Sequence, residues 1–181
     1  MNLTMNCRIG HLPGYCAATF LWPLILLASC TTIDYQGDGK FVDRGPFEGT
    51  DRYVVDLGVV DLGKAGQYKY VVGNLPPVQF FAGLEILENK PNVPRQRPPH
   101  GGRIRLLLET ENGQRVFGVD APLDEWGWSF RNNEPRSFLH QGSGSSFLPR
   151  SGAKYRLALE VVEPQPQARP ARLLVKGGGW Q

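Results

Sequence analysis

A chain of 181 residues with 41% hydrophobic content is long enough for one domain with its own core, which argues against a disordered or disulfide-stapled protein. Its 20 Lys plus Arg residues nearly balance 17 Asp plus Glu residues, so the overall charge gives no argument for nucleic-acid binding. All three cysteines lie within the first thirty residues, and this position excludes a disulfide framework for the rest of the chain.

The first 29 residues have the layout of an export signal. A short polar region that carries Arg8 and His11 precedes an apolar run over residues 17–27. This run is shorter than the roughly 20 apolar residues that a transmembrane helix needs, and Pro23 interrupts it. We therefore expect a cleaved signal peptide over residues 1–29 rather than a membrane-spanning helix.

The end of this run, Leu27-Ala28-Ser29-Cys30, resembles the lipobox of bacterial lipoproteins. The resemblance implies cleavage between Ser29 and Cys30 and attachment of lipid to the cysteine. Two or three acyl chains anchor a protein stably, since each buried CH₂ contributes about 0.8 kcal/mol. In this family an Asp after the cysteine favours the inner membrane, whereas Thr31 stands here. The resemblance therefore implies a lipid anchor in the outer membrane, with the domain facing the periplasm.

Residues 30–52 are predicted to form a tether. They combine scattered charges with Gly37, Gly39, Gly45 and Gly49. Tyr35 and the pair Phe41-Val42 are the parts of the tether that we expect to dock as an edge strand. The folded domain itself is predicted to span residues 53–181.

Beyond residue 52 the dominant pattern is the alternation of apolar and polar residues that half-buried strands show. In the clearest strand, residues 154–161, one face carries Tyr155, Leu157, Leu159 and Val161. Further strands are predicted at 53–62, 68–72, 78–88, 103–109, 115–119 and 171–176. Asn112-Gly113 favours a tight hairpin. Seven or eight such strands indicate an all-β, antiparallel β-sandwich of the jelly-roll or immunoglobulin/transthyretin-like kind, with a closed barrel as the alternative.

A strip of aromatic residues is the first candidate binding feature. Alternation places Trp126, Trp128 and Phe130 on one face of an extended segment. If these rings are exposed, they could stack on sugar rings as in a glycan-binding module. The other interpretation is that they fill the core, where large aromatic side chains usually lie.

A basic, proline-rich loop over residues 89–102 is the second candidate. It carries Lys90, Arg95 and Arg97, and Arg103 follows it directly. Loops of this length within compact domains tend to be functional or disordered. The cations could bind an anionic polymer such as lipopolysaccharide or peptidoglycan, and the alternative is a solvated loop without a partner.

No catalytic constellation is evident in the sequence. The segment Gln141–Ser146 lacks the lysine of a phosphate-binding loop and the glycine offsets of a nucleophile elbow. His100-Gly101-Gly102 is similar to the oxyanion loop of some esterases, which leaves a small envelope hydrolase as an alternative. We expect no catalytic residue, metal or cofactor, and predict a non-catalytic module that binds an envelope protein or an anionic polymer, not nucleic acid.

Overall fold

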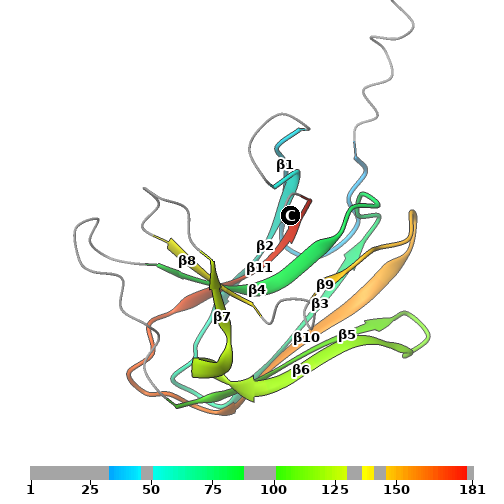
Figure 1. Cartoon of the computed structure of the whole chain (residues 1–181). Coiled ribbons are helices and arrows are strands. Elements are labelled where there is room, and N and C mark those ends of the chain that lie inside the picture. Colours follow the sequence, from blue (N-terminus) through cyan, green and yellow to red (C-terminus); the bar gives the residue numbers. More distant parts are fainter. Residues whose placement is uncertain (1–32, 46–50, 88–100, 130–135, 141–145, 179–181) are drawn as a thin grey trace, which may run out of the picture. The chain divides into compact units, whose positions relative to one another are not determined.

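Two antiparallel β-sheets pack face to face around a shared core (Figure 1). The structure is a computed structural model that describes residues 33–45, 51–87, 101–129, 136–140 and 146–178, with only the backbone of residues 87, 128, 129 and 136–140. These ranges all belong to one compact unit, Ile33–Gln181. The arrangement confirms the predicted all-β sandwich.

The larger sheet has seven strands in the order β1-β2-β11-β4-β8-β7, with β9 also paired to β4. Their bounds are β1 Lys40–Asp43, β2 Tyr53–Val60, β4 Phe80–Leu87, β7 Gly127–Ser129, β8 Arg136–His140, β9 Ser146–Phe147 and β11 Ala171–Gly177. The smaller sheet has the order β3-β10-β5-β6. Its strands are β3 Gly66–Gly73, β5 Arg103–Thr110, β6 Arg115–Pro122 and β10 Lys154–Glu163. A 3-10 turn, η1 Leu123–Glu125, links β6 to β7 and so carries the chain from one sheet to the other.

The core lies between the two sheets and follows the predicted alternation. The buried side chains of β10 are Tyr155, Leu157, Leu159 and Val161. They face a layer from the larger sheet that includes Val55, Phe80, Ala82, Leu84, Leu173 and Val175. Burying one such side chain contributes about 1.5–3 kcal/mol, so this layer supplies most of the driving force for folding.

The β5–β6 hairpin forms where Asn112-Gly113 predicts it. Four residues separate the two strands, and backbone hydrogen bonding between Thr110 and Gln114 leaves residues 111–113 as the loop. The N–H of Gly113 donates to the carbonyl oxygen of Thr110 at 3.0 Å, and the N–H of Thr110 donates to that of Gln114 at 2.9 Å. Gly113 has φ +81°, a conformation that glycine adopts without strain. The hairpin therefore uses Gly113 to close a three-residue turn rather than a two-residue Asn-Gly turn.

Residues 34–43 form part of the sandwich, although they lie within the predicted tether. Residues 34–38 run beside β3, where the N–H of Gln36 donates to the Gly73 oxygen at 3.1 Å and that of Asp38 to the Val71 oxygen at 2.8 Å. The chain then turns at Gly39 and pairs as β1 with β2. This entry segment, residues 34–43, thus hydrogen-bonds to β3 of the smaller sheet and to β2 of the larger sheet.

The glycines of the entry segment are required by close packing. A Cβ atom on Gly37 would overlap the carbonyl oxygen of Val71 and lie 2.7 Å from the Tyr35 hydroxyl oxygen. A Cβ on Gly39, where φ is +83°, would overlap the carbonyl oxygen of Asp56. These two glycines of the predicted tether therefore lie in packed positions, and strand pairing extends to the N-terminal side of residue 53.

Three stacked aromatic rings hold the entry segment on the core, as the predicted docking of Tyr35 and Phe41 requires. The ring centroids of Tyr35 and Phe41 are 5.1 Å apart, and those of Phe41 and Tyr53 are 5.5 Å apart. The Tyr35 hydroxyl donates to the carbonyl oxygen of Asp38 at 2.6 Å. Burial, with a smaller effect of Asp38, raises the pKa of Tyr35 to about 12.

Candidate functional site

Trp126, the first ring of the predicted aromatic strip, lies in the core. It directly follows η1, and only 2% of its surface is exposed. A ring at this depth cannot stack on a sugar, so the core interpretation is correct for Trp126. Trp128 lies in β7, where its backbone pairs with Leu139 of β8; its side chain and Phe130 are outside the described residues.

Five other predicted site residues lie outside the described residues. They are Ser29, Cys30, Lys90, Arg95 and Arg97. Arg103 is described, and it opens β5 directly after the basic loop. The candidate functional site that can be built from geometry is therefore the surface around Arg103.

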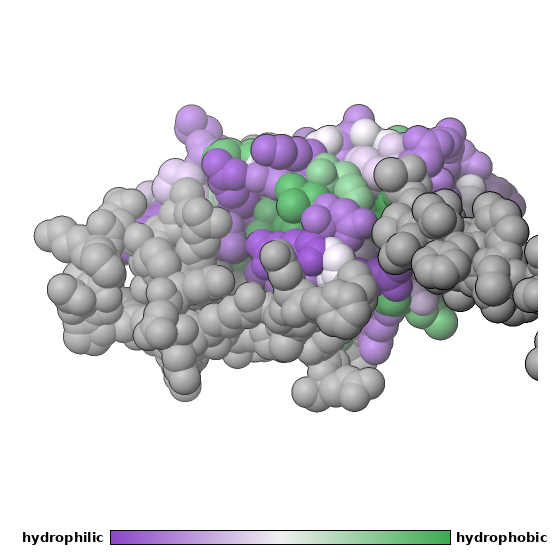
Figure 2. Space-filling model, turned by 90° about the horizontal axis from the view of Figure 1, so that it is seen from above, coloured by the Kyte–Doolittle hydropathy of each residue, from purple (hydrophilic) through white to green (hydrophobic). Residues whose placement is uncertain are grey.

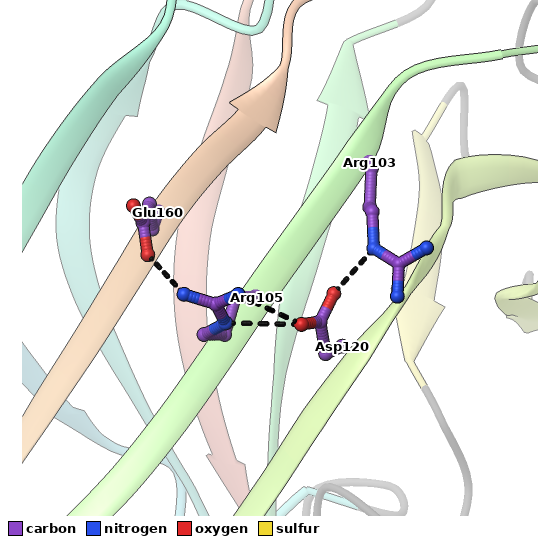
Figure 3. Close-up of polar contacts among 4 residues, drawn as sticks. All are labelled: Arg103, Arg105, Asp120 and Glu160. Carbon is purple, nitrogen blue, oxygen red and sulfur yellow. Dashed lines mark hydrogen bonds and ion pairs between the residues drawn. The ribbon is translucent and has the colours of Figure 1, made fainter.

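Arg103 belongs to a ladder of ion pairs on the outer face of the smaller sheet (Figure 3). Its Nε donates to Asp120 Oδ1 at 2.6 Å. Arg105 donates to Asp120 Oδ2 from both Nε and Nη2 at 3.0 Å, and its Nη1 donates to Glu160 Oε2 at 2.9 Å. We call these four residues the charged ladder. It joins three strands, because Glu160 is on β10, Arg103 and Arg105 on β5, and Asp120 on β6.

The strand register brings the charged ladder together. Arg105 stands opposite Glu160 on one side and Asp120 on the other. Arg103 and Arg105 flank the buried Ile104, so the alternation of β5 alone places both on the outer face. Asp120 and Glu160 were not singled out from the sequence, because a pairing partner depends on register between strands that are distant in the chain.

The electrostatics of the ladder favour its ionised form. Hydrogen bonds from Arg103 and then Arg105 hold the pKa of Asp120 below its usual range, and hydrogen bonding to Asp120 raises the pKa of both arginines. Two cations thus face two carboxylates in a charge-balanced row. An anionic ligand would have to displace Asp120 from Arg103, so the ladder is better suited to holding three strands in register than to binding a polyanion.

A shallow, less polar row lies next to the charged ladder on the same face. Ala158, Leu107 and Gly118 stand side by side in register across β10, β5 and β6. Ala158 and Leu107 are half-buried, and the guanidinium of Arg115 lies over Gly118. The outer face of the smaller sheet therefore combines fixed charge with a narrow apolar row.

The glycines of the predicted oxyanion loop have a structural role. Gly101 and Gly102 have φ +91° and +81°, and the Gly102 carbonyl oxygen accepts a hydrogen bond from the N–H of Leu123 at 2.9 Å. This contact joins the start of β5 to η1. His100 lies outside the described residues and only the backbone of His140 is described, so the hydrolase alternative gains no geometric support.

Within the described part of the chain, no cluster of three or more His, Cys, Asp or Glu side chains is arranged to hold a metal ion. The same residues contain no helix with the length and apolar character needed to cross a membrane. Comparisons with known protein families, with curated proteins and with solved structures gave no match.

The charged ladder predicts a pH-dependent effect of Asp120→Asn. Because the pKa of Asp120 is lower in the folded than in the unfolded protein, its carboxylate stabilises the fold above the unfolded value of about 3.9. This contribution is lost as pH falls through the folded pKa. We therefore expect Asp120→Asn to lower the urea midpoint at pH 7, and we expect the difference in midpoint from wild type to narrow as pH falls below about 3.9.

The measurement is urea unfolding of both proteins at pH 7, 5 and 3. Glu111→Gln, which removes one exposed carboxylate on the β5–β6 hairpin, is the matched control, and we expect its urea midpoint at pH 7 to equal that of wild type. A gap between wild type and Asp120→Asn that stays constant from pH 7 to pH 3 would contradict the role of the Asp120 charge in the ladder.

Proposed function

We propose that this protein is a cell-envelope lipoprotein, anchored through acylated Cys30, whose β-sandwich is a non-catalytic interaction module. The observation that carries the proposal is the lipobox Leu27-Ala28-Ser29-Cys30 directly before the folded unit, which begins at Ile33. Thr31, in place of Asp, supports the outer membrane as the location, with the sandwich in the periplasm.

The partner is best sought among envelope proteins. The charged ladder engages Arg103 with Asp120, which weakens the case for an anionic polymer at this position. Burial of Trp126 likewise weakens the glycan alternative. A protein partner fits the outer face of the smaller sheet, where charged residues surround the row formed by Leu107 and Ala158.

The test is intact mass spectrometry of the protein purified from the membrane fraction. We expect the mass of residues 30–181 plus two or three acyl chains. Cys30→Ala should abolish the acyl mass, whereas Cys16→Ala, which changes a cysteine of the predicted signal peptide, should leave it intact. A wild-type protein found in membranes with an uncleaved chain or without acyl mass would refute the proposal.

A further inference from the structure

The folded unit begins very close to the predicted lipid anchor. The carbonyl oxygen of Asp34 accepts a hydrogen bond from Asn74 Nδ2 at 2.6 Å, so the chain is held by the sandwich from this residue onward. Asp34 is only four residues after Cys30 in the sequence. Four residues reach at most about 14 Å even when fully extended. A lipid on Cys30 would therefore keep the surface around Asp34 near the bilayer.

One end of the sandwich surrounds this point, and we call it the entry end. The N–H of Asn74 donates to the Ala153 oxygen at 3.0 Å, and the N–H of Ala153 donates to the Arg150 oxygen at 3.2 Å. The loop 148–153 is thus tied, through Asn74, to Asp34. The first described residues enter beside the β3–β4 connection, at the top of Figure 1.

The side chains of the entry end suit the headgroup region of a bilayer. Arg150 and Lys154 are exposed, and Leu148 is 60% exposed. Figure 2, seen from above, shows a mainly hydrophilic surface around a small hydrophobic area. Cationic side chains pair with lipid phosphates while an apolar side chain enters the interface, so these residues fit lipid contact better than solvent alone.

We propose that the acylated protein lies with the entry end, Asp34, Asn74 and residues 148–154, against the lipid headgroups. The opposite end then points away from the membrane. It includes the β2–β3 turn, where the Lys64 side chain is 82% exposed. The eight residues of β3 separate the two ends by about 25 Å. This orientation rests on the proposed acylation of Cys30 and adds which surface meets the lipid and which remains open to a partner.

The test compares two single-cysteine labels on the full acylated protein in vesicles. A thiol-reactive fluorophore is attached to Ser151→Cys at the entry end or to Lys64→Cys at the opposite end. Because Cys30 is acylated in this protein, the introduced cysteine carries the thiol that reacts. The vesicles contain phosphatidylethanolamine and phosphatidylglycerol at 3:1, with a fraction of lipid that carries a nitroxide on its headgroup. We expect at least threefold stronger quenching at position 151 than at position 64.

A lengthened chain provides the control. Twelve Gly and Ser residues inserted between Thr32 and Ile33 should reduce the difference in quenching, because the entry end would no longer be held within four residues of the lipid. Intact mass of the same samples separates the two proposals. Acylated protein with equal quenching at both positions overturns the orientation and leaves the lipoprotein proposal standing, whereas a protein without acyl mass overturns both.

Discussion

Gly177→Ala is expected to lower the free energy of unfolding by about 3 kcal/mol, since overpacking of a tight core costs about 1–3 kcal/mol and sometimes more. Gly177 ends β11 and stands between Tyr53 of β2 and Phe80 of β4. A Cβ atom at this position would overlap the Tyr53 ring and lie 2.6 Å from its Cδ1. The ring cannot retreat, because Tyr53 is fully buried and Phe41 stacks on it.

Urea unfolding measures this effect. Gly66→Ala is the matched control, because Gly66 also lies in a strand and its added Cβ would meet only a Tyr68 carbon at 3.9 Å. We expect the control to change stability by less than about 0.5 kcal/mol. A Gly177→Ala protein as stable as wild type would show that the Tyr53 ring does not pack against Gly177 in solution.

Phe41→Ala is expected to cost about 2–3 kcal/mol and to release the entry segment. Burial of a complete core phenylalanine is worth about 3–5 kcal/mol, and Phe41 is half-buried. Its ring lies between those of Tyr35 and Tyr53, so both aromatic contacts are lost together. Because these contacts hold residues 34–38 beside β3, hydrogen exchange should become faster at the N–H groups of Gln36 and Asp38.

Hydrogen exchange and urea unfolding of Phe41→Ala test this prediction together. Val42→Ala, at the next position of β1, is the control; Val42 is 41% exposed, and we expect little change in either measurement. Loss of stability without faster exchange at Asp38 would mean that the ring stack supports the core but does not hold the entry segment.

Strand faces could be predicted from the sequence wherever a strand is long and alternates. β10 and β5 show this clearly, because each buries every second residue. The short strands β7, β8 and β9 were missed, since two to five residues are too few to show a period. β8 and β9 pair with β4, which lies far away in the sequence, and β7 pairs with β8.

The candidate site shows the same limit. The outward position of Arg103 follows from alternation in β5, but its partner Asp120 follows from the β5–β6 register. For Trp126, alternation leaves two interpretations, core or surface, because it groups side chains on one face without saying whether that face is buried. Which of the two holds depends on how η1 carries the chain from one sheet to the other, and this cannot be read from the sequence period.

The direction of the entry segment has a mechanical consequence for an anchored protein. Residues 34–38 run antiparallel to β3, with Gln36 beside Gly73 and Asp38 beside Val71. A pull from the N-terminal side along the strand axis would load these hydrogen bonds together in shear, rather than peel them apart one after another. A third contact, from the N–H of Val71 to Asp38 Oδ2 at 2.7 Å, would share that force. Thermal motion of a membrane would thus be transmitted to the sandwich as a whole before the segment detaches.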